Sequence, residues 1–168
     1  MLALAAAVPF KSVDEYNGVV LLDAVTYPKL VLSNNYVMMV MIAQKKQIGE
    51  YGTDSIRADY FDFADFVQRV AEVDNEGPSV LFTQILVNGA QNAKLAKQFG
   101  LEDDFTHPAL FVIPRGQKEP VRFPAAEPFH RDSLIRFLTT YTDFYFKIPG
   151  TLKQFDKLVV RFMNEPTE

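Results

Sequence analysis

Two histidines and one pair of adjacent lysines are the side chains in this sequence best suited to acid–base or nucleophilic chemistry. His107 and His130 lie beside predicted loops, with no Ser/His/Asp spacing and no metal-ligand cluster nearby, so we expect both on the surface. A desolvated lysine can act as a nucleophile, but Lys45 and Lys46 are neighbours in a predicted exposed loop, which favours a solvated basic turn. The chain contains no cysteine, so it cannot carry out disulfide exchange. We therefore predict no catalytic residues, and a binding function rather than an enzyme.

Metal, nucleic-acid and membrane functions are also disfavoured. Asp59, Asp62 and Asp65 share one predicted helix and drift around its surface, whereas a loop that binds a hard cation has ligands at alternate positions and a turning glycine. The net charge is −4 without a lysine- and arginine-rich stripe, which is atypical of nucleic-acid binding. No stretch approaches the roughly 20 apolar residues of a membrane span. We predict no metal, no cofactor and no membrane insertion.

Strands and helices alternate in the hydrophobic pattern along most of the chain. The predicted strands are Val19–Asp23, Tyr36–Ala43, Ser79–Val87, Pro108–Ile113 and Pro120–Phe123, and the predicted helices are Thr26–Ser33, one that begins at Thr53 or Asp54, Ala90–Phe99 and Arg131–Phe146. Two parallel βαβ units followed by an antiparallel hairpin and a last helix resemble the thioredoxin order. We therefore predict an α/β, thioredoxin-like fold: a central mixed sheet flanked by helices, followed by the start of a helical segment.

Two loop positions follow from the thioredoxin order. The redox pair of such folds lies after the second strand, which here corresponds to Lys46–Gly49, so Lys46 and Gly49 mark the position of the lost pair. The second position is Pro108, which follows His107 at the start of an apolar strand. A cis bond at Pro108 would expose backbone groups that pair with an extended substrate chain; a purely structural turn is the alternative.

Three segments make up the predicted organisation of the chain. Residues 1–17 are a leader remnant or a flexible N-terminus, because the stretch Met1–Pro9 is apolar and rich in small residues but lacks a basic region. Residues 18–147 form the thioredoxin-like domain. Residues 148–168 are a linker and the first helix of a truncated C-terminal helical domain. The apolar stripe of the predicted helix Thr151–Met163 needs a partner, which is either this same domain or, as we favour, that second domain.

Several motifs, taken in order, resemble one family. They are the segment Gly18–Asp23, the strand Tyr36–Met41, the run His107–Phe111 and the junction Ile148–Leu152 followed by Phe155, Asp156 and Leu158. Together with the absent cysteines, they resemble the redox-inactive relatives of protein disulfide isomerase in the endoplasmic reticulum protein 29 (Windbeutel) family. The resemblance covers roughly residues 18–163.

The resemblance implies a non-catalytic chaperone or escort that binds unfolded or secretory client proteins in the endoplasmic reticulum lumen as a homodimer. The family dimerises around its first strand, and the matching positions are Gly18 and Asp23, with Leu21 and Leu22 as interface neighbours. The family binds peptides with aromatic residues after the second strand, where this chain has Tyr51 as the only nearby aromatic. Tyr51, His107 and Pro108 are therefore the candidate peptide-binding residues. The alternative is a cytosolic thioredoxin-like scaffold or interaction domain.

Overall fold

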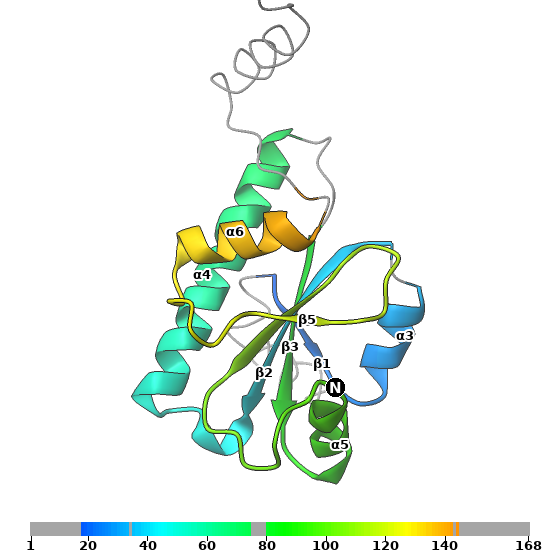
Figure 1. Ribbon diagram of the computed structural model, residues 1–168, viewed down its shortest axis with the longest axis vertical. Coiled ribbons are helices and arrows are strands. Elements are labelled where there is room, and N and C mark those ends of the chain that lie inside the picture. The colour runs from blue at the N-terminus through cyan, green and yellow to red at the C-terminus, as the bar shows by residue number, and fades with distance from the viewer. Residues whose placement is uncertain (1–17, 34, 75–79, 143, 145–168) are drawn as a thin grey trace, which may run out of the picture.

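A five-stranded mixed sheet forms the centre of the computed structural model, which describes residues 18–33, 35–74, 80–142 and 144 (Figure 1). The strands lie in the order β1-β3-β2-β4-β5. Their bounds are β1 Val20–Leu22, β2 Val37–Gln44, β3 Val80–Val87, β4 Ala109–Ile113 and β5 Val121–Arg122. The first three strands are parallel, while β4 is antiparallel to both β2 and β5.

Helices cover both faces of the sheet. In Figure 1, α4 and α6 lie on one side of the strands, and α3 and α5 lie on the other. Their bounds are α3 Thr26–Leu32, α4 Tyr51–Asp74, α5 Ala90–Gln98 and α6 Arg131–Tyr141, with a short 3-10 turn, η2, over Lys45–Gln47 between β2 and α4. Within the residues that the structure describes, no helix is both long and apolar enough to cross a membrane.

The central strand β2 shows why both faces must be covered. Its side chains are buried along its whole length, and alternate residues of a strand point to opposite faces. Met39 and Met41 therefore join the core under α4 and α6, whereas Met38 and Val40 join the core under α3 and α5. An unbroken apolar strand of this kind is typical of parallel sheets with helices on both sides.

Helix α4 is fixed to the sheet by a buried tyrosine. The Tyr60 hydroxyl donates to the carbonyl oxygen of Thr83 at 2.8 Å and accepts from the Thr83 backbone N–H at 3.1 Å. The Met39 carbonyl oxygen lies 3.2 Å from the same hydroxyl and also accepts a hydrogen bond, of 2.8 Å, from the Thr83 side chain. The orientation of α4, which begins beside the predicted redox position, therefore depends on a polar contact inside the core.

The predicted strands and helices agree with the structure except at several boundaries. Helix α4 begins at Tyr51, ahead of the predicted Thr53 or Asp54. Helix α6 ends at Tyr141 and not at Phe146, because Thr142 adopts an extended conformation. The leader-like stretch, the predicted linker and the helix Thr151–Met163 lie outside the described residues.

Candidate functional site

The segment that replaces the redox pair is a tight polar turn. Lys46 is exposed in η2, and Gly49 has a φ of +100°, in the left-handed region that favours glycine. The Gly49 N–H donates to the Asp54 carboxylate at 2.9 Å, which joins this turn to the first turn of α4. Neither Lys46 nor Gly49 offers a thiol, so the turn supplies shape and positive charge but no redox group.

A buried glutamine connects the end of β2 to the loop that carries His107. The Gln44 side chain donates to the backbone carbonyl of Asp103 at 3.1 Å. Asp103 is further held by an exposed ion pair with Lys97, whose ammonium lies 2.9 Å from the Asp103 carboxylate. These contacts position the start of the 103–108 loop relative to the end of β2, and nothing in the sequence pattern pointed to Gln44.

His107 and Pro108 meet at a pocket of about 180 Å³ that we call the Pro108 pocket. Its apolar walls come from three parts of the chain: Ile56 of α4, Pro108 before β4, and Phe123 and Phe129 after β5. The rings of Phe123 and Phe129 pack edge to face with centroids 5.6 Å apart. The lining of the pocket is therefore largely apolar, with the exposed His107 and the charged Arg122 and Glu127 also taking part.

The peptide bond before Pro108 is trans, because no peptide bond among the described residues is cis. The cis geometry considered from the thioredoxin order is therefore wrong for this chain. Trans is the form that X–Pro bonds favour by about 0.5–1 kcal/mol.

Tyr51 does not line the Pro108 pocket. It is 89% exposed at the first residue of α4, close in sequence to the exposed Ile48. The structure therefore separates the three predicted peptide-binding residues: His107 and Pro108 line the pocket, whereas Tyr51 lies outside it, near Ile48 in the sequence. Sequence reasoning missed the pocket residues Ile56, Phe123 and Phe129. The helical spacing of apolar residues marked Ile56 as a core residue, and the sequence pattern gave no signal for Phe129.

The predicted dimer-interface residues lie at and beside β1, which is an edge strand of the sheet. Leu21 is 49% exposed and its neighbour Val20 is 42% exposed, whereas Leu22 is only 4% exposed and packs in the core. Leu21, Leu22 and Asp23 also line a pocket of about 280 Å³ with Lys45. The exposed apolar side chains of β1 are therefore those of Val20 and Leu21, which point to opposite faces of the sheet.

Asp23 has a local structural role that the sequence pattern did not reveal. Its carboxylate accepts hydrogen bonds from the backbone N–H groups of Val25 and Thr26, at 2.9 and 2.8 Å, and from the Thr26 hydroxyl at 2.9 Å. The bond from the Thr26 backbone is the main reason that the pKa of Asp23 is lowered below its usual value, followed by the Thr26 hydroxyl. Asp23 thus holds, in its ionised form, the turn that leads into α3.

Gly18 has a close neighbour as well. Its φ is +70°, and its carbonyl oxygen accepts a hydrogen bond of 3.2 Å from the Gln68 side chain of α4. A Cβ atom at this position would lie only 2.3 Å from the Gln68 amide nitrogen. The positive φ therefore favours glycine here, and a side chain would in addition have to displace the end of the Gln68 side chain.

The histidines occupy surface positions, as predicted from the sequence. His130 caps α6, where its ring nitrogen Nδ1 accepts from the Ser133 backbone N–H at 3.4 Å. In the part of the chain that the structure describes, no group of three or more His, Cys, Asp or Glu side chains is placed to hold a metal ion. His130 has a local structural role in helix capping.

Comparisons with known proteins place the fold but not the family. The sequence matches no family model, and it matches no curated protein sequence. Among solved structures, the J-Trx1 fragment of ERdj5 shares 16% sequence identity with a TM-score of 0.54; the match covers 76% of this chain and 53% of that one. This chain thus aligns with about half the length of the ERdj5 fragment.

Two further structures have the same architecture. A chain in the complex of ferredoxin:thioredoxin reductase with thioredoxin f2 is 14% identical with a TM-score of 0.52, and the match covers 74% of this chain and 94% of that one. The first two thioredoxin domains of Eps1p from Saccharomyces cerevisiae are 11% identical with a TM-score of 0.50, and the match covers 71% of this chain and 50% of that one. These similarities, with the strand order β1-β3-β2-β4-β5, establish that the chain has a thioredoxin-like fold.

Proposed function

We propose that this chain is a redox-inactive, non-catalytic chaperone or escort domain that binds secretory client polypeptides in the endoplasmic reticulum lumen as a homodimer. The observation that carries the proposal is a thioredoxin-like fold whose redox position holds Lys46 and Gly49, in a chain without cysteine. Such a domain keeps the surfaces of the fold but has no thiolate for exchange. The lumenal location rests on the resemblance to the endoplasmic reticulum protein 29 family and on the apolar stretch at the N-terminus.

Client binding is supported by apolar groups that remain accessible at one end of the sheet. The Pro108 pocket presents the rings of Phe123 and Phe129 together with Ile56. The exposed Tyr51 and Ile48 follow the carboxyl end of β2. Unfolded clients expose apolar side chains, and a pocket of about 180 Å³ suits one such side chain.

The client-binding experiment measures the affinity for a permanently unfolded, carboxymethylated polypeptide by fluorescence anisotropy. We expect Tyr51→Ser to weaken binding, because it removes the most exposed aromatic ring at the start of α4. The matched control is Tyr36→Ser, since Tyr36 is also exposed but precedes the amino end of β2, at the opposite end of the sheet. Equal affinities of Tyr51→Ser and the unaltered chain would contradict a client site at this end.

Dimerisation is supported by the exposed apolar edge at β1. Among the described residues β1 pairs with β3 alone, so one side of its backbone is open. Edge strands with exposed apolar side chains tend to associate, and a symmetric dimer uses the same patch on both subunits. Val20 and Leu21 flank the open edge of β1 on its two faces, beside Gly18 and Asp23.

Light scattering over a dilution series tests the dimer. We expect a dimer that dissociates on dilution, and we expect Leu21→Lys to be monomeric throughout because it places two like charges at the interface. Leu32→Lys is the control, since Leu32 is an exposed leucine on α3 and not on β1. A monomer at every concentration, or a Leu21→Lys variant that dimerises normally, would contradict the proposed dimer and favour the alternative of a thioredoxin-like scaffold domain.

A further inference from the structure

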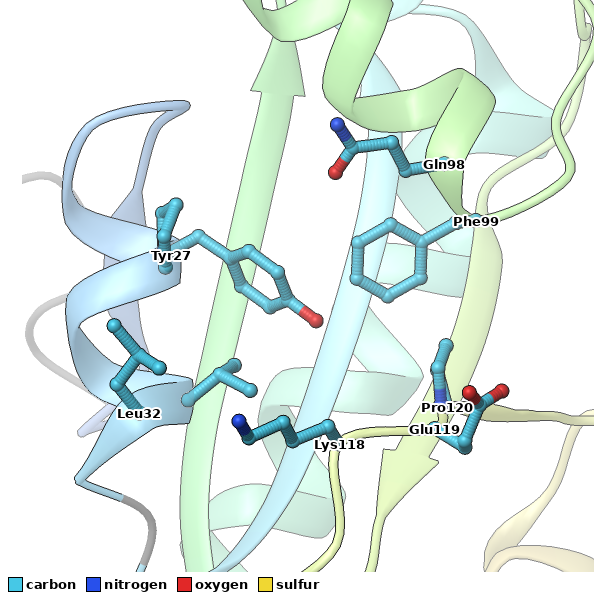
Figure 2. A pocket seen from close by; sticks show the side chains of 9 residues that line it. Tyr27, Leu32, Gln98, Phe99, Lys118, Glu119 and Pro120 are labelled. Atoms are coloured by element: carbon cyan, nitrogen blue, oxygen red, sulfur yellow. The ribbon is translucent and has the colours of Figure 1, made fainter.

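A second pocket, of about 410 Å³, lies on the opposite face of the sheet from α4 and α6 and shares no residue with the Pro108 pocket. Figure 2 shows side chains converging on it from α3, from the end of α5 and from the segment before β5. Small-molecule pockets in proteins have volumes of about 300–1,000 Å³ and are mostly apolar with a few placed polar groups. This pocket, which we call the Tyr27 pocket, has both properties.

Packed aromatic rings form the floor of the Tyr27 pocket. The Tyr27 and Phe99 rings pack with centroids 5.2 Å apart, and Phe99 packs edge to face on the core residue Phe111 at 4.8 Å. Val31 and Leu32 of α3 extend the apolar surface toward solvent. A ligand would therefore meet an apolar surface that is packed on the core of the domain.

The Tyr27 hydroxyl is a polar group that this floor presents to the pocket. Tyr27 is 9% exposed, and no described residue forms a hydrogen bond with its hydroxyl. Burial raises the pKa of the phenol to about 12, so the hydroxyl keeps its proton at neutral pH and can donate it. Figure 2 shows the hydroxyl pointing into the space between α3 and the segment that carries Lys118. The hydroxyl oxygen is open to the pocket and is not a buried atom without a partner, so a ligand acceptor would take the place of water there.

A positive charge stands at the mouth of the same pocket. The exposed Lys118 forms no ion pair with any described residue. Its side chain reaches toward α3 in Figure 2, whereas the carboxylate of Glu119 points away from it. The hydroxyl of Tyr27 and the ammonium of Lys118 are thus two donors beside one apolar surface, which favours an anionic acceptor joined to an apolar body.

We propose that the Tyr27 pocket binds a small carboxylic acid with an apolar body. The carboxylate accepts hydrogen bonds from Tyr27 and Lys118, and the apolar body lies on Phe99 and the α3 side chains. This site is independent of the client-binding function, because it lies on the other face of the sheet and uses none of the same residues. Either function can therefore fail without affecting the other.

The test is an NMR titration of the full 168-residue chain with 3-phenylpropionate and with its uncharged match, 3-phenylpropionamide. We expect saturable shifts of the Leu32, Phe99 and Lys118 amide signals with the acid and markedly weaker binding of the amide. Added salt weakens binding of the acid, since the ion pair at Lys118 is exposed. Equal affinity for acid and amide, or the absence of saturable shifts, would overturn the proposal.

Single variants test which side chains donate hydrogen bonds to the carboxylate of the ligand. Tyr27→Phe removes only the hydroxyl and is expected to weaken acid binding about tenfold, as for a hydrogen bond to a charged group. Lys118→Gln is expected to weaken it about two- to fivefold. Lys94→Gln, on an exposed lysine of α5 outside the pocket, is the control and leaves the affinity unchanged. An unaltered affinity in Tyr27→Phe would refute the role of the hydroxyl.

Two further measurements refine the assignment. The unfolding temperature of Tyr27→Phe distinguishes a binding role of the hydroxyl from a structural one, and titration with a peptide distinguishes a small acid from the carboxyl end of a polypeptide. Because the Tyr27 hydroxyl has no described partner, Tyr27→Phe should unfold at the same temperature as the unaltered chain or higher, and a clear loss of stability would indicate a structural role instead. An N-acetylated tripeptide with a free terminal carboxylate is titrated in parallel. Weaker binding of the peptide supports the small acid, and tighter binding overturns that assignment in favour of polypeptide ends.

Discussion

The hydroxyl of Tyr60 should contribute more to stability than that of any exposed tyrosine in this chain. The ring is fully buried, and its hydroxyl bonds the Thr83 backbone at 2.8 and 3.1 Å. Burial raises the pKa of Tyr60 well above its usual value, so the group stays neutral and bonds in the same way across the physiological pH range. Tyr60→Phe deletes one oxygen and leaves the ring, so the change isolates these hydrogen bonds.

We expect Tyr60→Phe to lower the free energy of unfolding by about 2 kcal/mol, because it leaves a buried N–H and a buried carbonyl without the hydroxyl. For a chain of this length such a loss lowers the melting temperature by about 4–8 °C. The measurement is urea and thermal unfolding followed by circular dichroism. Tyr51→Phe is the matched control, since its hydroxyl is exposed and surface changes are usually within about 0.5 kcal/mol.

A double variant tests whether Tyr60 acts through the hydrogen-bonded group. Thr83→Val removes the Thr83 hydroxyl, which donates to the same Met39 carbonyl that lies beside Tyr60. Because the two side chains share this partner, the losses from Tyr60→Phe and Thr83→Val should not add. If Tyr60→Phe loses no more unfolding free energy than Tyr51→Phe, the reasoning is refuted. If the losses in the double variant are strictly additive, the shared contact with Met39 is refuted.

Two further predictions concern the residues around β1. The pKa of Asp23 is lowered in the folded chain, so its contribution to stability is present above the ordinary value of 3.8 and is lost as the pH falls through the lowered pKa. Asp23→Asn should therefore flatten the acid limb of a stability–pH profile, and an unchanged limb would contradict the role of the ionised carboxylate in the turn before α3. Gly18→Ala should lower the free energy of unfolding by about 1–2 kcal/mol because of its φ of +70°, and by a further amount for the displacement of Gln68. The control is Gly116→Ala, which has a φ of +72° and nothing near its Cβ position, so it carries the backbone cost alone. Equal losses of stability in thermal unfolding would show that Gln68 yields freely.

The Gly18 result also determines how the dimer should be studied. Any side chain at Gly18 strains the backbone and displaces Gln68. A monomeric Gly18 variant would therefore confuse a lost interface with a damaged fold. Leu21 is the better probe, because its side chain is exposed and its removal disturbs no described hydrogen bond.

The architecture could be predicted because it depends on repeating patterns. The unbroken apolar run that became β2 indicated a strand buried on both faces, and the three-four spacing after Gly52 indicated the long helix α4. Boundaries were less predictable, because single contacts decide them. Asp54 bonds back to Gly49 within the first turn of α4 and is not the residue before it, and Thr142 turns extended before the predicted end of α6.

The candidate sites were predictable only in part. The order of elements located the segments around Lys46 and Pro108, since the position of a loop follows from the strands that it connects. It did not show that Ile56, Phe123 and Phe129 surround Pro108, because these residues come from different elements. It also gave no reason to connect Tyr27 with Phe99.

By itself, the sequence determined that the chain has no thiol and that the apolar run of its central strand is unbroken, as two covered sheet faces require. Composition and spacing are properties of the chain and need no folding to be read. Only the tertiary structure decided that Leu22 is buried while Leu21 is exposed, and that Tyr27 and Lys118 share one pocket. Those outcomes depend on how helices and strands from distant parts of the chain pack together, and local spacing carries no record of that packing.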